Sequence, residues 1–330
     1  MMKGGLESLL RIDAARESDR IAEFIRRYTR QLKRDGAVVG LSGGIDSAVS
    51  VALCVEALGP GKVLGLILPE KESNPVSADF ARRHAERLGI TWELVDITPV
   101  LDAFGTYSRR DQVIQSLCSG YGPGCRIKLS LPPNLLERDA YNVFTLTIVR
   151  GNEVVIRTRL DKAQLNAIVA ATDTKQRTRM MHLYYYAERQ NYLACGTTNR
   201  TELLQGFFVK YGDGGVDIEP LAHLYKHQVY QLADVLHVPE EIINRLPSPD
   251  TFSLAVSDEE FYFRMPYRIL DPLLLAWERK LDARETADSL GLTEDQVRRA
   301  FRDFNAKHRS TEHLRTLPPS LEGTLMGEER

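Results

Sequence analysis

The motif Ser-Gly-Gly-Ile-Asp-Ser at residues 42–47 combines the chain's most specific set of chemical groups. Apolar residues precede it and follow it, which predicts a buried strand, a tight glycine turn and a helix N-terminus. Such a turn directs backbone N–H groups and the positive end of a helix dipole at one point, which suits a phosphate. A carboxylate such as Asp46 belongs beside phosphate only if a cation lies between them. The motif therefore predicts binding of pyrophosphate with a divalent metal ion, as in cleavage of ATP between its α- and β-phosphates.

This loop resembles the PP-loop of the N-type ATP pyrophosphatases. It is not a Walker loop, because the Gly-Lys-[Ser/Thr] ending of that motif is missing. An ordinary glycine turn in a strand–helix crossover is the alternative. Serines, glycines and an aspartate coincide behind an apolar strand, which favours nucleotide binding.

The composition narrows the class of protein. With 330 residues and 43% hydrophobic content, the chain can form one large α/β domain or two smaller ones. A formal charge of −2 disfavours nucleic-acid binding. No apolar run is long enough to span a bilayer, and residues 1–19 lack the apolar core of a signal peptide. Cysteines are few (Cys54, Cys118, Cys125, Cys195), so we expect a reduced, cytoplasmic protein without a membrane partner.

Predicted strands and helices alternate along most of the chain. The first helix is expected over residues 18–32, with Ser18 as its N-cap. Strands are predicted over residues 37–41, 62–68, 91–97 and 192–195. Further helices are predicted over about 47–58, 77–88, 174–190 and 226–236. This βαβ pattern predicts an α/β fold with a doubly wound parallel sheet flanked by helices, and with ligands at the carboxyl ends of the strands.

The alternation stops between residues 109 and 162, which we interpret as an insertion within a single domain spanning 1–330. Two alternating runs, 144–149 and 153–160, flank Arg150-Gly151-Asn152 and predict a β-hairpin. A surface decoration, a lid over the active site and part of an oligomer interface all stay open. Cys118 and Cys125 could be half of a zinc site, but two further ligands are not evident nearby.

The C-terminal part, residues 272–310, is predicted to be helical. Residues 282–302 resemble a helix-turn-helix, but their many acidic residues and the lack of a basic arm disfavour DNA recognition. Residues 317–330 are expected to form a loose tail.

Three later features suit the same chemistry as the PP-loop. In Gly-Thr-Thr-Asn-Arg-Thr-Glu at residues 196–202, Glu202 could give the metal a second carboxylate, although on its own a glutamate there is more often a helix N-terminal charge. Residues 208–217 place a lysine and two aspartates around a glycine-rich loop. Lys226 opens a helix and could reach a phosphate, although on its own it could be a solvated lysine.

Together with Lys-Gln-Arg-Thr-Arg-Met at 175–180, these motifs resemble ammonia-dependent NAD synthetase over residues 18–105 and 173–319. The resemblance implies an adenine nucleotide alpha-hydrolase-like, Rossmann-type fold. It implies amidation of deamido-NAD to NAD with ATP and free ammonia, through an adenylated intermediate, with release of AMP and pyrophosphate. It also implies Mg²⁺ as cofactor and a homodimer.

The resemblance also implies residue roles. The ATP-binding residues would be Gly40, Leu41, Ser42, Gly43, Gly44, Ile45, Asp46, Ser47, Thr197, Lys226 and Ser248. The deamido-NAD-binding residues would be Arg177, Lys210, Asp217, His308 and Arg309. Asp46 and Glu202 would hold the metal, and Asp46, Lys226 and Asp213 would be catalytic, with Asp213 helping to deprotonate ammonium.

Some residues depart from the family pattern. These are the insertion, an aromatic run at 260–267 after the acidic pair Asp258-Glu259, and Asp173 in place of an asparagine. We expect residues 248–258, hereafter the lid segment, to cover the adenylate; a surface loop of no importance is the alternative. An amide ligase of the same fold acting on another carboxylate and a non-catalytic nucleotide binder stay open as alternative functions.

Overall fold

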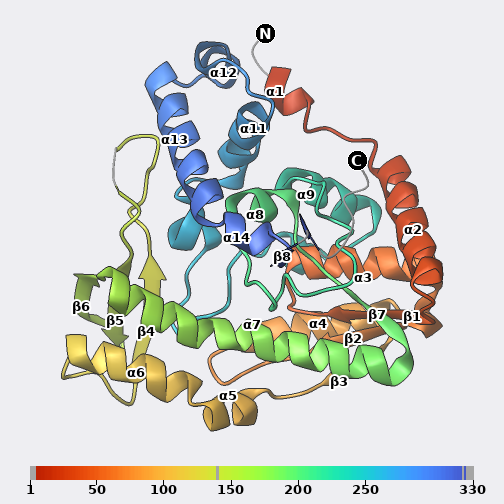
Figure 1. Ribbon diagram of the computed structural model, residues 1–330, viewed down its shortest axis with the longest axis horizontal. Helices are drawn as coiled ribbons and strands as arrows, with labels where there is room; N and C mark the ends of the chain where they lie inside the picture. Colours follow the sequence, from red (N-terminus) through yellow and green to blue (C-terminus); the bar gives the residue numbers. More distant parts are fainter. Residues whose placement is uncertain (1–4, 139–140, 322, 325–330) are drawn as a thin grey trace.

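The computed structural model describes residues 5–138, 141–321 and 323–324. Its centre is a four-stranded parallel sheet with the order β3-β2-β1-β7 (Figure 1). The strands are β1 (Gly36–Gly40), β2 (Val63–Ile67), β3 (Thr91–Leu94) and β7 (Tyr192–Cys195). Because β1 pairs with both β2 and β7, the loops that follow β1 and β7 emerge side by side. The predicted doubly wound α/β class is confirmed.

Helices cover both faces of this sheet. One face packs against α2 (Ala14–Gln31), α3 (Ile45–Leu58), α4 (Pro75–Arg87) and α9 (Lys226–Val235). The other packs against α5 (Thr98–Phe104), α6 (Thr106–Leu117) and α7 (Lys162–Gln190). Successive residues of β1 point to opposite faces, so Val39 joins the first core and Val38 the second. Both are fully buried, as a parallel sheet requires.

Helix α2 begins before its predicted start. Its N-cap is Asp13, whose side chain accepts a hydrogen bond from the Arg16 backbone N–H. The prediction of Ser18 as N-cap was therefore wrong. Ser18 lies inside the helix, where its Oγ donates to Oε2 of Glu56 at 2.6 Å. Both residues can begin a helix, and here the earlier one does.

Helix α7 is much longer than the predicted 174–190. It begins at Lys162 behind a capping box formed by Asp161 and Gln164. Its first part packs with Leu165 and Ile168 against the inserted region, and its second part packs with Leu183 and Ala187 against the sheet. Because the two parts face different cores, no single apolar stripe runs along the helix.

The inserted region forms a second, antiparallel sheet with the order β4-β5-β6. The predicted hairpin is confirmed as β5 (Thr145–Arg150) and β6 (Glu153–Arg159). Strand β4 (Cys125–Ser130) was not predicted, and it pairs with β5 along its whole length. Cys118 and Cys125 are both free thiols. In the described ranges no group of three or more His, Cys, Asp or Glu side chains is arranged to hold a metal ion.

The C-terminal part is helical, as predicted. It comprises α11 (Tyr267–Glu278), α12 (Ala283–Leu290), α13 (Glu294–Ser310) and α14 (Glu312–Arg315), and α1 (Gly5–Ser8) packs against it. The predicted start at Pro272 was too late, because that proline lies inside α11. Two-residue strands β8 (Pro319–Ser320) and β9 (Gly323–Thr324) pair in the predicted loose tail, and residues 325–330 of the tail lie outside the described residues.

Short helices complete the fold between these parts. They are η1 (Pro60–Lys62), α8 (Arg200–Gln205), α10 (Glu240–Ile243) and the π-helix η2 (Glu259–Phe263). Among the described helices, none combines the length and the apolar character needed to cross a membrane.

Candidate active site

The PP-loop follows β1 and leads directly into α3, as predicted. Gly44 is the N-cap of α3, and no side chain caps this helix. The first N–H groups of the helix are therefore available to an anion. Inside the loop, Ser47 Oγ accepts from the Ser42 N–H at 3.2 Å and donates to the Gly44 carbonyl at 3.0 Å. These bonds fix the turn, while the Ser42 side chain stays exposed.

Gly43 makes the tight turn possible. Its φ is +72°, and a Cβ at this position would overlap the backbone carbonyl of Ser77 in α4. The Gly43 carbonyl accepts from an Nη of Arg245 at 3.2 Å, and the other Nη donates to Ser77 Oγ at 2.8 Å. The loop is thus held between α4 and the residues that precede the lid segment.

Asp46, Glu202 and Lys226 come together at the carboxyl ends of β1 and β7. Lys226 opens α9, and its buried Nζ forms an ion pair with Oδ2 of Asp46. Oδ1 of Asp46 accepts from Nδ2 of Asn199 at 3.0 Å. Asn199 also caps α8, where it and Glu202 bond to each other's backbone N–H groups. Glu202 is thus both a helix-capping charge and a carboxylate of this cluster.

The electrostatics of the cluster follow from burial and mutual charge. Burial raises the pKa of Glu202 well above its usual range, and the charge of Asp46 raises it further. Burial alone would lower the pKa of Lys226, but the charges of Asp46, Glu202 and Asp258 outweigh it and raise that pKa. Lys226 is therefore positively charged at neutral pH, and several carboxylates lie close enough to interact with that charge.

The residue types fit a magnesium ion. Carboxylate oxygens are the ligands that Mg²⁺ prefers, and it usually takes only one or two from the protein while phosphate and water supply the rest. Burial of Glu202 beside Asp46 places two such carboxylates at the uncapped N-terminus of α3. Where the ion binds, Asp46 and Glu202 would hold it.

Two further buried carboxylates lie next to this cluster: Asp258, which the sequence indicated only as part of an acidic pair, and Asp271, which it did not single out. Asp258 accepts from the Tyr267 hydroxyl at 2.9 Å through Oδ2, whereas its buried Oδ1 has no hydrogen-bond partner among the described residues. Burial raises the pKa of Asp258 to about 6. Asp271 accepts from Thr201 Oγ1 and from the His227 N–H, and burial raises its pKa to about 7. A polar residue inside an apolar helix sequence was the available signal for Asp271.

The residues expected to bind deamido-NAD are spread over several elements and do not form one cluster. Nε of the exposed Arg177 lies 3.4 Å from the Lys210 carbonyl. Nζ of Lys210 donates to the carbonyls of His313 and Thr316 at 2.7 and 2.8 Å, so α7 and the glycine-rich loop meet the segment after α13. His308 contacts the Leu204 carbonyl of α8 through Nδ1 at 3.0 Å.

Two residues predicted to bind deamido-NAD, Asp217 and Arg309, form hydrogen bonds within the chain. Asp217 accepts from the Ala194 N–H at 2.8 Å and from the Tyr184 hydroxyl at 3.1 Å. Its carboxylate therefore also satisfies a backbone N–H of β7. Arg309 is exposed and donates to Asn305 within its own helix at 3.3 Å. These contacts leave both assignments as predictions.

Asp213 lies in the glycine-rich loop, where its Oδ1 accepts from the Val209 N–H at 2.8 Å. Burial raises its pKa to about 6, and the charge of Asp173 adds to this shift. Burial likewise raises the pKa of Asp173 to about 6. This part of the site therefore holds two carboxyl groups that titrate near neutral pH.

Thr197 and Glu219 flank the end of β7. Thr197 is partly exposed directly after the strand. Glu219 accepts from the neighbouring Thr198 N–H at 3.1 Å, and burial raises its pKa to about 8. A Cβ on Gly196 would overlap the carboxylate of Glu219, so a larger residue there would displace that side chain. The sequence reasoning did not single out Glu219.

Ser248 is exposed at the start of the lid segment, and its Oγ accepts from the Asp250 N–H at 3.2 Å. Residues 248–257 of the lid segment contain no helix or strand, and its last residue, Asp258, is the N-cap of η2. At its far end, Asp258 reaches the cluster around Lys226, because both contact Tyr267: its hydroxyl bonds Asp258, and its ring centroid lies 5.4 Å from Lys226 Nζ.

Comparison with known proteins identifies the family of this chain. The family model described as NAD synthase matches residues 17–120 and 141–318. The NH(3)-dependent NAD(+) synthetase of Mesorhizobium japonicum is 45% identical over 311 residues, which cover 94% of this chain and 97% of the relative. The enzyme of the same name from Thermotoga maritima is 38% identical over 262 residues, or 79% of this chain and 87% of the relative.

Solved structures agree on the fold. The NH3-dependent NAD synthetase of Campylobacter jejuni superposes with a TM-score of 0.63 at 23% identity, covering 94% of this chain and 100% of that one. The NMN synthetase of Francisella tularensis gives 0.64 at 24% identity, covering 94% and 99%. From the family match over most of its length and the 45% identity to a full-length relative, the chain belongs to the NAD synthase family.

Proposed function

We propose that this protein amidates deamido-NAD to NAD with ATP and free ammonia, releasing AMP and pyrophosphate. The observation that carries the proposal is the convergence of Asp46, Glu202 and Lys226 at the uncapped N-terminus of α3. A cation, two carboxylates and free backbone N–H groups at one point suit a nucleotide triphosphate with its metal ion.

In the first step, the nicotinate carboxylate attacks the α-phosphorus of ATP, and the bond between that phosphorus and the bridging oxygen breaks. Pyrophosphate leaves with both electrons of that bond. The N–H groups of the PP-loop and the ammonium of Lys226 bind the negative charge of the leaving group. Mg²⁺, where bound by Asp46 and Glu202, supplies further neutralisation of phosphate charge.

In the second step, ammonia attacks the acyl carbon of the adenylate, and AMP leaves. Ammonia is protonated at neutral pH, so a base must take one proton from ammonium. Asp213 suits this task, because its pKa of about 6 leaves it ionised at neutral pH and makes it a stronger base than an ordinary aspartate. Arg177 and Lys210, which meet beside this loop, would bind the dinucleotide together with Asp217, His308 and Arg309.

Two finer features belong to the same proposal. We infer that the protein is a homodimer and that it works in the cytoplasm, as the resemblance to its family implies. Light scattering at working concentration tests the first inference: a particle of twice the 37.3 kDa chain mass is expected, and a monomer would contradict it.

The test of the function is an assay of AMP, pyrophosphate and NAD with ATP, Mg²⁺ and ammonium, with and without deamido-NAD. We expect AMP only when deamido-NAD is present, in equal amount to the NAD detected by mass. Folded protein that binds ATP but forms no AMP with deamido-NAD would refute the assignment and favour another carboxylate as substrate. Omission of Mg²⁺ tests the metal separately and should stop AMP formation.

A further inference from the structure

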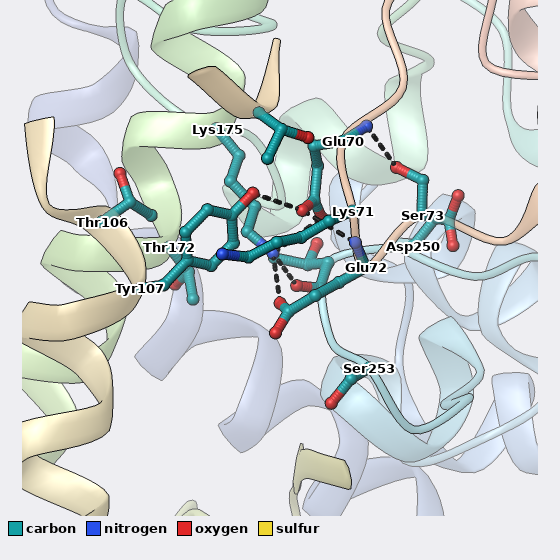
Figure 2. Close-up of polar contacts among 12 residues, drawn as sticks. Glu70, Lys71, Glu72, Ser73, Thr106, Tyr107, Thr172, Lys175, Asp250 and Ser253 are labelled. Atoms are coloured by element: carbon teal, nitrogen blue, oxygen red, sulfur yellow. Dashed lines mark hydrogen bonds and ion pairs between the residues drawn. The ribbon is translucent and has the colours of Figure 1, made fainter. Parts of the chain in front are cut away.

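The lid segment is attached to the core of the protein by Lys175 of α7. This lysine is completely buried, and its Nζ donates to Oε1 of Glu70, Oε2 of Glu72 and the carbonyl of Thr251, each at 2.8 Å (Figure 2). All three hydrogens of the ammonium are therefore used. Thr251 belongs to the lid segment, so the lid supplies one of the partners of this buried ammonium.

The carboxylates that bind Lys175 are themselves fixed. The hydroxyl of Tyr107 in α6 donates to Oε2 of Glu70 at 2.6 Å, and Figure 2 shows the tyrosine ring pointing from α6 toward the segment that carries Glu70 and Glu72. Arg110 forms two parallel bonds to Glu72 at 2.6 and 2.8 Å. Lys175 therefore offers the lid a rigid anchor rather than a mobile side chain.

On another side, the lid runs along strand β4. The Leu254 N–H donates to the Ile127 carbonyl at 2.9 Å, and the Ile127 N–H donates to Ser253 Oγ at 3.0 Å. Phe252 and Val256 of the lid are buried in the core of the inserted sheet, in one cluster with Ile127. The lid thus supplies both hydrogen bonds and apolar side chains to this sheet.

The same contact continues beyond the lid into η2. Lys128 of β4 forms an ion pair with Glu260 at 2.6 Å, and the Leu131 N–H donates to the Glu260 carbonyl at 3.1 Å. Nε of Arg264 donates to the Pro132 carbonyl at 2.7 Å. Residues 127–132 therefore contact the chain repeatedly from the lid segment to Arg264, shortly before α11 begins.

The attached lid lies at the PP-loop. Near its first end, Asp250 accepts from Ser77 Oγ at 2.9 Å, and the Ser77 carbonyl lies against Gly43. At its last residue, Asp258 shares Tyr267 with Lys226. The contacts to Lys175 and β4 therefore decide whether this stretch of chain stays over the candidate nucleotide site.

We propose that strand β4 is a clamp that holds the lid segment closed before nucleotide binds, with Lys175 as a positioning residue that anchors the lid to the core. The clamp strand and its neighbours fall in residues 121–140, which the NAD synthase family model leaves unmatched. The role of the lid in excluding water from the adenylate rests on the proposed function, whereas the closure itself does not.

Hydrogen exchange of the nucleotide-free protein tests the closure without any turnover, so failure of the proposed function would not affect the result. The variant is Lys128→Glu, which replaces the ion pair to Glu260 by repulsion at a partly exposed position. Its matched control is Arg126→Glu on the same strand, because Arg126 donates to the Gly151 carbonyl and not to the lid. We expect about fivefold or faster exchange in peptides covering 248–264 for Lys128→Glu and no change there for Arg126→Glu.

A second pair of variants tests the apolar attachment. Phe252→Ala should raise lid exchange by roughly a hundredfold and raise the KM for ATP more than it lowers kcat. Phe24→Ala makes the same truncation on α2 and should leave both quantities unchanged. Lid amides that exchange in the wild type as fast as in an unfolded peptide, or equal lid exchange in Lys128→Glu and Arg126→Glu, would overturn the proposal.

Discussion

Replacement of Asp46 by asparagine separates the chemistry of the site from its stability. The side chain keeps its shape and loses its charge. Its two present partners, Lys226 and Asn199, both donate to a carboxylate oxygen. Asparagine has only one acceptor oxygen, so one of these two contacts must be lost.

The cost to stability follows from the burial of Lys226. Only 2% of its side chain is exposed, against 17% for Asp46. Removal of one partner from a buried ion pair typically costs about 3–5 kcal/mol. Glu202 and Asp258 still act on Lys226 and the amide can still accept one bond, so we expect about 2 kcal/mol and a fall in Tm of a few degrees. From the sequence, Asp46 is expected on an exposed loop, where Asp46→Asn would leave the fold intact; the structure instead places it in the first turn of α3, with 17% of its side chain exposed.

The cost to activity is expected to be much larger. The Asp46→Asn variant would keep the helix N-terminus but lose one of two metal-binding carboxylates. Loss of a preorganised charge at a phosphoryl centre lowers kcat by about 10²–10³-fold. AMP formation from ATP, ammonium and deamido-NAD should fall by at least this factor in Asp46→Asn. Asp234→Asn, an exposed aspartate on α9, should leave AMP formation unchanged.

The two readouts together can refute the reasoning. Thermal unfolding by calorimetry and AMP formation by chromatography are measured on the same preparations. AMP formation within threefold of the wild type would remove Asp46 from the metal site and with it the PP-loop assignment. An unchanged Tm would show that Lys226 does not depend on Asp46, contrary to the ion pair described above.

Three further substitutions test individual contacts. Gly43→Ala forces alanine to a positive φ against the Ser77 carbonyl, so the free energy of unfolding should fall by about 2 kcal/mol and the KM for ATP should rise at least tenfold; Gly61→Ala, with nothing close to its added Cβ, should change neither, and equal behaviour of the two would contradict the steric argument. Glu219 has a pKa raised by burial to about 8, so the folded protein binds a proton that the unfolded chain lacks between pH 4.5 and 8. This stabilisation is complete below pH 4.5 and is lost as the pH rises to 8; Glu219→Gln should therefore gain up to about 4 kcal/mol relative to the wild type between pH 5 and 8 in urea unfolding, and parallel pH profiles would refute the shift. Lys175→Met leaves two buried carboxylates without their cation and should lower the free energy of unfolding by about 3–5 kcal/mol, also by urea unfolding, whereas a loss below 1 kcal/mol would mean that they find other partners.

The parallel sheet and the PP-loop could be predicted from the sequence because their signals are local. Each buried strand is a short apolar run that ends in turn residues, as at Val39 and Gly43. Strand β4 gave a weaker signal, since it lies between cysteine- and proline-containing loops and pairs with a strand that begins at Thr145. Its identity depends on that distant partner, which a local pattern does not contain.

The candidate site was predictable to a similar extent. Asp46, Glu202 and Lys226 each lie in a recognisable motif, and the structure brings all three together. Asp258 was noted only as part of an acidic pair, because its burial depends on how the lid segment folds back. The contacts of Lys175 were not predictable at all, since Glu70 lies 105 positions away in the sequence.

The neighbouring positions of β1 and β7 have a consequence for synthesis of the chain on the ribosome. All of residues 41–191 are translated between these two strands, and Lys226 follows Asp46 by 180 positions. Until β7 emerges, β1 presents an open sheet edge beside a PP-loop that lacks its carboxylate and lysine partners. Such an edge can pair with other nascent chains. The nucleotide site is therefore completed late in translation, and protection of the β1 edge by chaperones or by early packing of α2 and α3 matters more here than in a sheet built in sequence order.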